Sequence, residues 1–546
     1  MAASLLHVAL LVRLGKPHPS GLRSDSNAYL ELAWNLWHHG VYGSRVSVEY
    51  PPVVPMVYAP LMAIGDNTAR FTALYAVHAA VFVAASLLLL RPLTATVGRA
   101  RAWATLAVLQ LGGSVIVHGY LAQSEGVFLA VLLGAAAAVY AVVERASAPR
   151  WFALGAAATL AVATRRIGLV VPAAAALTVG TWLVSSRGAP ESRRGLWALP
   201  LGLLAGWAPE LVAQALHGDS LSAYAGGPVK GHITGGIWAF QSPRHLQRLL
   251  HFIGLHLAWS TLATAGAPLI LGAGLIWRYE DRPRWGVALP APSAALAAFA
   301  GLAWLGMTAL SVLHVARYQF GSARRTGWDL YPRYVDPAEP LLVLAAVVVV
   351  GGLAASLDRR RTIAVWAAVA AAVGLLSYPL TTVRGGRLLG AKGFADLGFG
   401  DLSPAMLLLP LLALVALRAV LFVKHKPGLA LALMLAASWC LSFRSPVARL
   451  RPSTFRPPAV LQHDLVAADP RAPLAVLVRK KTNFRRYYYE PGFRSDHPVD
   501  WVRSDDLRGW MNEHPTGFVL SHDKDTAPKL PVAAEVGDWR VHRASE

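Results

Sequence analysis

Three carboxylates in this chain lie where an apolar stretch meets a polar one. They are Asp25, Glu49 and Glu125. A carboxylate held at the end of an apolar helix, under a structured loop, can work as a base on a substrate whose other half is lipid. Asp25 falls in the polar segment between the first two apolar stretches, so it should lie at a membrane face. This placement makes Asp25 the first candidate for a catalytic residue.

Each of these carboxylates also has a purely structural interpretation. An Asp ahead of a helix often caps the first backbone N–H groups, although Ser24 can fill that role and leave Asp25 available. Glu49 precedes a turn at 50–52 that two prolines make rigid, and a solvated loop charge explains it equally well. Glu125 is favourable at a helix N-terminus whatever its role. For Glu49 and Glu125 both interpretations stay open.

Several basic side chains expected on the same side of the membrane could bind a phosphate group. Arg165 and Arg166 interrupt a long apolar stretch, and Arg333 lies between Tyr331 and Tyr334. A guanidinium can bind two phosphate oxygens at once through its planar fork. The arginine pair could equally form a plain turn between two spans. Aromatic anchoring at the interface accounts for the tyrosines but less easily for the arginine between them, so the second cluster is predicted to clamp a lipid phosphate.

The bulk composition predicts a polytopic α-helical membrane protein. The 546 residues are 55% hydrophobic and 15% charged, with a mean hydropathy of +0.44, against about 25% charged residues in a soluble domain. The net charge of +21 comes without a nucleic-acid recognition motif and fits anionic headgroups. About thirteen spans are expected from the apolar runs: 1–14, 69–90, 102–119, 124–143, 151–164, 167–184, 196–216, 256–277, 287–314, 338–357, 363–380, 404–422 and 427–443.

Clusters of Arg and Lys in short loops predict the orientation. They follow every second span, for example at 91–101, 144–150 and 358–361, so they should share the cytoplasmic side. The other side then carries the long loops, at 15–68, 217–255, 315–337 and 381–403.

The first long loop contains an amphipathic pattern at 27–39, which predicts a helix lying along the interface. Its apolar face would consist of Tyr29, Leu32, Ala33, Leu36 and Trp37.

Residues 444–546 change character and predict a small extracytoplasmic α/β domain after the membrane domain of residues 1–443. Strands are expected at 474–478, 517–520 and 532–541. A helix is expected at 500–514, with an inner face made of Trp501, Leu507 and Trp510. The single cysteine, Cys440, excludes a disulfide framework.

In this order, the pieces resemble the GT-C class of integral-membrane glycosyltransferases, especially the protein O-mannosyltransferases and the lipid A aminoarabinose transferase. The matching elements run through residues 1–443: Asp25 in the first outer loop, a helix ending in His39-Gly40-Val41-Tyr42, the run Glu49-Tyr50-Pro51-Pro52, Glu125 at the start of the fourth span, and Arg333-Tyr334-Val335-Asp336-Pro337. No motif is specific alone, but the ordered set is more specific than any one of them. In the aminoarabinose branch a lysine precedes the Pro-Pro pair. Tyr50 takes its place here, which removes a candidate phosphate contact.

The resemblance implies transfer of a sugar, with inversion, from a polyprenyl-phosphate carrier to a lipid, glycan or protein acceptor. Asp25 would be the base that deprotonates or orients the acceptor hydroxyl, and Glu125 a second carboxylate near the acceptor or a metal. The substrate-binding residues implied are Glu49, Tyr50, Arg165, Arg166, Tyr331, Arg333 and Tyr334. The resemblance requires no cofactor, although the outer carboxylates could hold a divalent metal ion.

The resemblance also implies a multi-pass protein of the bacterial inner membrane, with the active site and the C-terminal domain on the periplasmic or extracellular side. The alternative is a polytopic lipid or sugar transporter or flippase without transferase chemistry. That class predicts charged or broken segments at mid-bilayer and paired inverted halves. In this sequence the ionisable residues gather at the expected membrane faces and the halves do not mirror each other, which favours the transferase.

Overall fold

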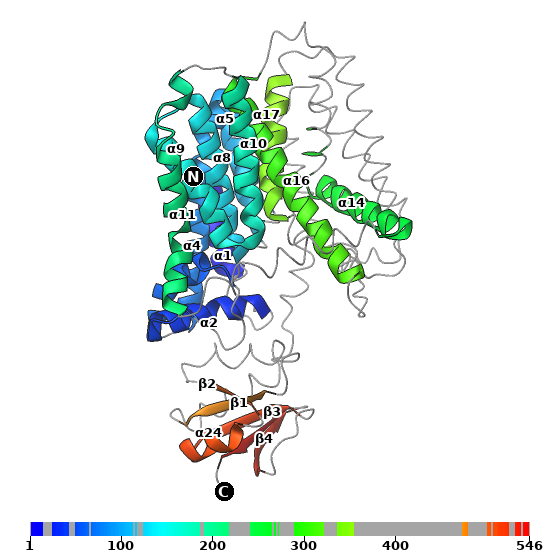
Figure 1. Ribbon diagram of the computed structural model, residues 1–546. Coiled ribbons are helices and arrows are strands. Elements are labelled where there is room, and N and C mark those ends of the chain that lie inside the picture. Colours follow the sequence, from blue (N-terminus) through cyan, green and yellow to red (C-terminus); the bar gives the residue numbers. More distant parts are fainter. Residues whose placement is uncertain are drawn as a thin grey trace.

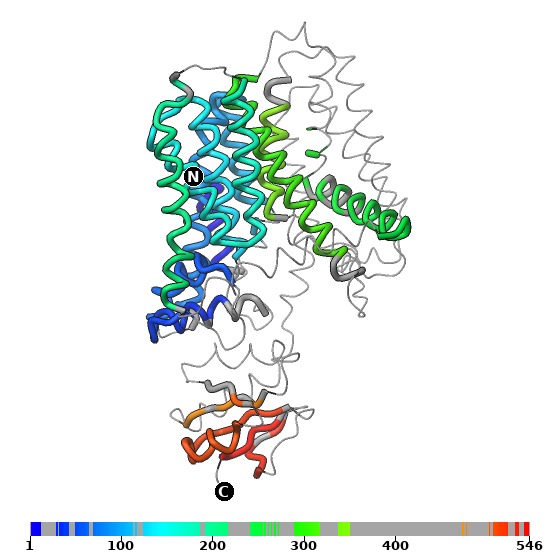
Figure 2. Tube along the Cα trace, viewed as in Figure 1, coloured from blue at the N-terminus to red at the C-terminus, as the bar shows by residue number. Residues whose placement is uncertain are grey.

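The computed structural model describes most of the first 353 residues and part of the C-terminal region (Figure 2). The described residues are 2–14, 24–42, 50–64, 67–112, 115–116, 119, 124–185, 190–217, 241–264, 267–268, 271, 289–320, 336–353, 472–478, 499–503, 506–522, 530–536 and 539–544. The predicted spans at 363–380, 404–422 and 427–443 and the predicted boundary at 444 lie outside them.

Helices packed side by side form the body of the protein (Figure 1). They are α1 (Ala2–Leu14), α4 (Asn67–Leu87), α5 (Leu90–Val97), α6 (Arg99–Leu111), α8 (Ser124–Glu144), α9 (Ala148–Thr164), α10 (Val170–Ser185), α11 (Ala198–His217), α16 (Ala291–Phe320) and α17 (Glu339–Leu353). Within the described residues, five segments are long and apolar enough to cross a membrane: Ala69–Val97, Ser124–Glu144, Arg166–Ser185, Ala198–Leu216 and Ala291–Ala316. All five coincide with predicted spans, whereas the total of thirteen stays a prediction.

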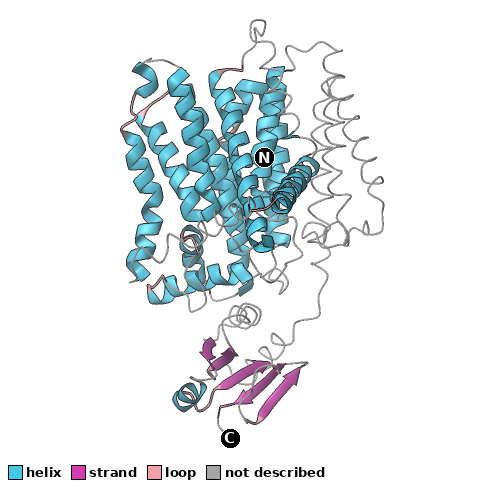
Figure 3. Cartoon of the chain, turned by 45° about the vertical axis from the view of Figure 1, so that its right-hand side comes forward, coloured by secondary structure: helices cyan, strands magenta, loops and turns pink. Residues whose placement is uncertain are grey.

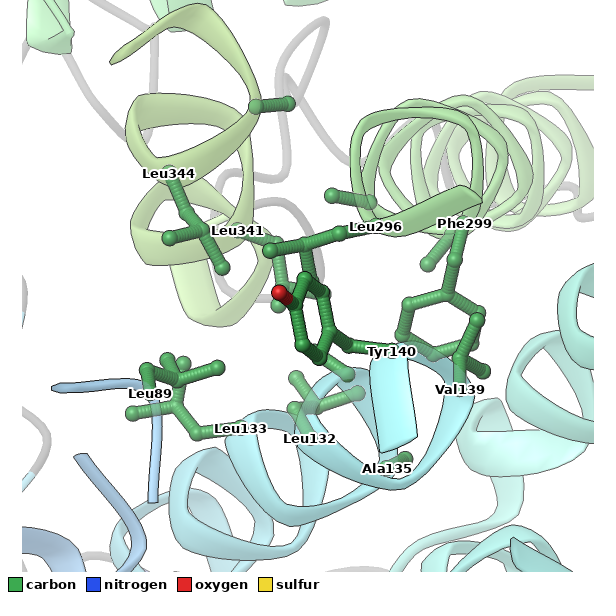
Figure 4. Close-up of a cluster of buried hydrophobic side chains, with 14 of the residues drawn as sticks. Leu89, Leu132, Leu133, Ala135, Val139, Tyr140, Leu296, Phe299, Leu341 and Leu344 are labelled. Atoms are coloured by element: carbon green, nitrogen blue, oxygen red, sulfur yellow. The ribbon is translucent and has the colours of Figure 1, made fainter. Parts of the chain in front are cut away.

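Helix α8 runs through the core of this body. It has no charged residue between Glu125 and Glu144, and its 21 residues extend for about 31 Å at 1.5 Å each, close to the hydrocarbon thickness of a bilayer. A helix that is apolar all round is expected to be buried. Figure 4 shows its side chains packed against α16 and α17, with Tyr140 between them; the other labelled residues are Leu89, Leu132, Leu133, Ala135, Val139, Leu296, Phe299, Leu341 and Leu344.

Helix α2 (Ser24–His39) lies across one end of the helical body (Figure 1), which we call the α2 end. Three residues of the predicted apolar face, Tyr29, Leu32 and Ala33, are buried there. Trp37 does not belong to that face, because 48% of it is exposed. The predicted helix therefore exists, and it covers the ends of the bundle helices.

The segment after α2 continues beneath it as α3 (Val53–Tyr58) and the 3-10 helix η2 (Ala59–Ala63). Arg70 of α4 ties this segment down. Its Nε donates to the carbonyl oxygen of Ile64 over 2.9 Å, and its guanidinium lies 5.5 Å from the ring centroid of Trp34 in α2. Helices α2, α3 and η2 are therefore fixed on the body by apolar packing together with this arginine.

The opposite end of the body holds two of the basic loops that the charge pattern places together, those at 91–101 and 144–150. Glu144, the last residue of α8, pairs with Arg91 over 2.8 Å and with Arg150 over 3.2 Å. The hydroxyls of Thr96 and Ser293 lie 2.7 Å apart, so α16 also begins at this end. Since α8 ends here, its first residues lie at the α2 end.

Helix α14 (Pro243–Ala263) packs against α16 at an inclination seen in Figure 1. His256 Nε2 lies 2.9 Å from Ser311 Oγ, and the indole N–H of Trp304 donates to Ser260 Oγ over 3.1 Å. The prediction of a loop at 217–255 and a span from 256 is wrong at this boundary. The helix begins 13 residues earlier, in a polar amphipathic stretch that hydropathy does not detect.

The C-terminal residues form a five-stranded sheet, shown beyond the α2 end in Figures 1 and 3. Its strands are β1 (Leu474–Val478), β2 (Val499–Arg503), β3 (Phe518–His522), β4 (Val532–Val536) and β5 (Trp539–Arg543), in the order β2-β1-β3-β5-β4. β1 pairs in parallel with β2 and β3, while β5 is antiparallel to β3 and β4. Helix α24 (Leu507–Glu513) packs on the sheet through Leu507 and Trp510.

The predicted helix at 500–514 is wrong in its first part. Residues 499–503 form strand β2, in which Trp501 pairs with Val476 of β1. The run Val-Asp-Trp-Val-Arg contains two β-branched valines and a tryptophan, which favour a strand, and pairing with the neighbouring strand β1 overrides its weak helical pattern.

Candidate functional site

Glu125 is buried at the α2 end, in the first turn of α8. Its Oε1 lies 2.9 Å from a terminal nitrogen of Arg165, whose side chain is also nearly inaccessible. Two opposite charges withdrawn from water attract strongly, and removing either leaves the other buried without its counter-charge. The structure therefore joins two residues that the sequence placed in separate candidate clusters.

The next residue, Arg166, turns to a different helix. Its guanidinium donates to Glu210 Oε1 over 2.7 Å. Glu210 is buried in α11, directly after Pro209. The two arginines thus connect one turn of the chain to α8 on one side and to α11 on the other.

The turn that carries the two arginines is short, because one extended residue and a 3-10 helix make the whole connection between α9 and α10. Helix α9 ends at Thr164, and the 3-10 helix η3 (Arg166–Leu169) leads directly into α10. Arg165 has an extended backbone with φ of −159°, and successive side chains of an extended segment point to opposite sides. A Cβ at Gly168 would lie only 2.1 Å from the carbonyl oxygen of Ala161. Glycine at 168 therefore allows the close turn that directs the two arginines apart.

A chain of hydrogen bonds lies beside Glu125. The hydroxyl of Tyr58 is 2.7 Å from His78 Nε2, and His78 Nδ1 is 2.9 Å from the carbonyl oxygen of Gly119. Both side chains are buried. Burial raises the pKa of Tyr58 well above its ordinary value, with smaller contributions from Tyr75, Tyr29 and Glu125. The phenol therefore stays protonated and can donate a hydrogen bond.

Tyr50, which the resemblance places in the substrate cavity, is held by two other tyrosines of the first loop. The rings of Tyr29 and Tyr50 meet edge to face with centroids 4.9 Å apart. The hydroxyl of Tyr42 donates to the carbonyl oxygen of Tyr50 over 2.7 Å. Tyr50 is half-buried. Its segment is thus attached to α2, the helix whose first turn contains Asp25.

The structure describes the side chains of four predicted site residues. Glu125, Arg165 and Tyr50 lie at the α2 end, and Arg166 is directed to Glu210. For Asp25 the structure describes the backbone, in the first turn of α2, and not the side chain. The positions outside the described residues are Glu49, Tyr331, Arg333 and Tyr334.

Sequence reasoning missed three members of this region: Tyr58, His78 and Glu210. The statement that ionisable residues gather at the membrane faces is wrong for His78 and Glu210, which are buried within candidate spans. An ionisable residue inside an apolar run is itself a functional signal and could have identified both. Tyr58 carries no such signal, because a tyrosine near a membrane interface is common. In the part of the chain that the structure covers, no three His, Cys, Asp or Glu side chains are grouped to hold a metal ion.

No family model matches the chain, and no curated protein matches it in sequence. Among solved structures, the crystal structure of ArnT from Cupriavidus metallidurans bound to undecaprenyl phosphate has a TM-score of 0.55 and 16% identity. The similarity covers 98% of this chain and 97% of that chain. The fold is GT-C-like. The apo state of the same ArnT gives a TM-score of 0.55 at 15% identity, with the same coverage.

The GT-C-like fold confirms the resemblance that the ordered motifs predict, and it extends over nearly the whole chain. Another similar structure, arabinosyltransferase EmbB from Mycobacterium smegmatis, has a TM-score of 0.48 and 15% identity and covers 83% of this chain and 41% of that chain. In this GT-C-like fold, Glu125, Arg165 and Tyr50 lie at the end of the bundle that α2 covers.

Proposed function

We propose that this protein is a membrane glycosyltransferase that moves a sugar from a polyprenyl-phosphate-linked donor to an acceptor. The observation that carries the proposal is the gathering of the buried Glu125–Arg165 pair with the Tyr50 and Tyr58 segment at one end of a GT-C-like fold. The ArnT structure of the same fold was obtained with undecaprenyl phosphate bound, which supports a lipid phosphate as the leaving group here.

In the proposed reaction, Asp25 accepts the proton of the acceptor hydroxyl as the hydroxyl oxygen attacks the anomeric carbon. The bond between that carbon and the phosphate oxygen breaks, and the lipid phosphate departs with the bonding electrons. Attack from the face opposite the phosphate inverts the anomeric configuration. A base in hydrogen-bond reach of the acceptor contributes about 10²- to 10⁴-fold.

The charge that accumulates on the phosphate is met by arginines in a water-poor site. Arg165 is the described candidate for this role, with Arg333, Tyr331 and Tyr334 proposed beside it. Arg166, paired with Glu210, keeps the turn in place.

The α2 end is proposed to face the periplasm or the extracellular space, with Glu49 and Tyr50 lining the cavity and Glu125 near the acceptor. The basic loops at the opposite end, joined by Glu144, support a cytoplasmic location for that end. A lipid carrier would then enter from the bilayer at the level of α2.

The proposal is tested with purified full-length protein, undecaprenyl-phosphate sugars of several kinds and an acceptor-containing envelope extract, with and without a chelator. One donor should be consumed, with release of undecaprenyl phosphate. The chelator arm shows whether a divalent ion takes part. If no donor is consumed but the protein moves labelled donors across proteoliposome membranes, the transporter alternative holds and the proposal is wrong.

A further inference from the structure

His78 lies between the two segments that would carry the proposed carboxylates, and its hydrogen bonds have a defined direction. A carbonyl oxygen can only accept, so the Nδ1 of His78 donates to Gly119. A neutral imidazole has one donor and one acceptor nitrogen. Its Nε2 therefore accepts, and the hydroxyl of Tyr58 donates to it over 2.7 Å. The ring is held from both sides in one tautomer and one orientation.

The same ring rests on the first turn of α8. A Cβ at Gly126 would lie 2.6 Å from His78 Nδ1 and 3.0 Å from Cε1. No side chain fits there while the imidazole keeps its place, so Gly126 permits the close approach. Gly126 directly follows Glu125. The position of His78 is thus coupled to the backbone that carries this carboxylate.

On its other side, His78 is coupled to the first loop. Tyr58 is the last residue of α3, which starts directly after the proline-rich turn. Tyr50, before that turn, packs on Tyr29 of α2. A continuous series of contacts therefore runs from α2 through α3 and His78 to the first turn of α8.

We propose that His78 and Tyr58 are positioning residues that fix α2, and with it Asp25, relative to Glu125. The proposal rests on the transferase function proposed above. A displacement of about 1 Å at a catalytic group can cost about 10²-fold in rate, and a catalytic group on a surface helix needs a rigid connection to the core. The Tyr58–His78–Gly119 chain provides that connection through two hydrogen bonds inside the bundle.

The first test compares Tyr58→Phe with Tyr140→Phe. Each substitution removes one hydroxyl and keeps a ring in the buried body, but Tyr140 lies in the second half of α8, away from the α2 end. For Tyr58→Phe, kcat should fall about 10- to 100-fold while the KM for donor stays within about twofold, because the donor contacts are unchanged. Tyr140→Phe should keep the wild-type kcat. An equal effect of both variants on kcat would overturn the proposal.

The second test uses a matched pair of histidines. His256 also bridges a backbone carbonyl, that of Phe252, and a hydroxyl, that of Ser311. His78→Phe should lower kcat, whereas His256→Phe should lower thermal stability alone. His78→Gln should restore part of kcat, because an amide can donate to Gly119 and accept from Tyr58. If kcat follows the melting temperature in all three variants, the role of His78 is structural and the proposal fails.

A third measurement separates this proposal from the proposed function, because it needs no turnover. Spin labels are placed on Trp37→Cys in α2 and Leu204→Cys in α11, both exposed positions, in a Cys440→Ser background. Double electron–electron resonance should show a broader or shifted distance distribution in Tyr58→Phe. In Tyr140→Phe the distribution should be the same as in the parent protein. An unchanged distribution in Tyr58→Phe would overturn the positioning role even if the enzyme is active. A changed distribution in a protein that consumes no donor would support the coupling and count against the transferase.

Discussion

Arg165 holds Glu125 with a nitrogen–oxygen distance of 2.9 Å, while its neighbour Arg166 holds Glu210 at 2.7 Å. The turn between α9 and α10 is thus tied to α8 and to α11, at the end of the body that α2 covers. A guanidinium that already holds a carboxylate can bind a phosphate only by sharing or exchanging that partner. In the proposed transferase, the arrival of the donor phosphate would therefore change the surroundings of Glu125.

The Glu125–Arg165 pair should show strong coupling in stability. Glu125→Gln and Arg165→Gln should each lower the free energy of unfolding by about 3–5 kcal/mol, because each leaves a buried charge without its counter-charge. The double variant should lose clearly less than the sum of the two. Thermal unfolding of the purified protein followed by tryptophan fluorescence measures this. Arg91→Gln is the control, since Arg91 is mostly exposed and a surface pair contributes about 0–1 kcal/mol. Additive losses would show that the two residues do not interact.

Gly168→Ala should open the turn that directs the two arginines apart. The new Cβ would lie 2.1 Å from the Ala161 carbonyl oxygen, and overpacking of this kind costs about 1–3 kcal/mol or more. Gly134→Ala is a matched control inside α8, because its Cβ would meet no atom within 4 Å. That variant should be neutral or slightly stabilising, since alanine favours helix. Equal melting temperatures for the two variants would contradict the assigned role of Gly168.

Asp25→Asn tests the proposed base. If Asp25 takes the acceptor proton, kcat should fall by about 10²- to 10⁴-fold while donor affinity and thermal stability stay close to wild type. Steady-state donor consumption and binding of a labelled polyprenyl phosphate measure the two effects. Glu144→Gln provides the control, because it neutralises a carboxylate at the opposite end of the body. Near-normal turnover by Asp25→Asn would exclude this residue as the base.

The C-terminal sheet should lose stability in mild acid. His542 Nε2 lies 2.8 Å from Ser521 Oγ. Burial lowers the pKa of His542, the backbone carbonyl of Leu530 partly offsets this, and the positive charge of Arg540 lowers it further. Because the folded pKa is below the unfolded value of about 6.5, the unfolded chain binds the proton first as pH falls. Stability is therefore retained above about pH 6.5 and decreases below it, until the folded pKa is reached.

Hydrogen exchange of strands β3 and β5 between pH 8 and pH 5, corrected for intrinsic exchange rates, measures this loss. His542→Gln should remove most of the pH dependence, because an amide does not titrate. A pH dependence that persists in the variant would assign the effect to another group.

The spans were predictable where the local sequence decides the structure. In a membrane a helix satisfies all its own backbone hydrogen bonds, so a long apolar run such as Ser124–Glu144 has one stable form, whatever surrounds it. The start of α14 and strand β2 were mispredicted for the opposite reason. Both depend on partners elsewhere in the chain, α16 for the polar turns of α14 and β1 for the short strand.

The pattern of apolar and charged residues is enough to establish a helical membrane protein in which Glu125, Arg165 and Arg166 stand at the ends of apolar runs. The pairing of Arg165 with Glu125 and of Arg166 with Glu210, and the link that His78 makes between Tyr58 and the first turn of α8, are visible only in the folded chain. Apolar helices are similarly favourable beside lipid and beside each other, so hydrophobicity does not specify neighbours. Close packing at small residues such as Gly126 and Gly168, together with the buried polar pairs, selects which helices lie side by side and thereby assembles the site.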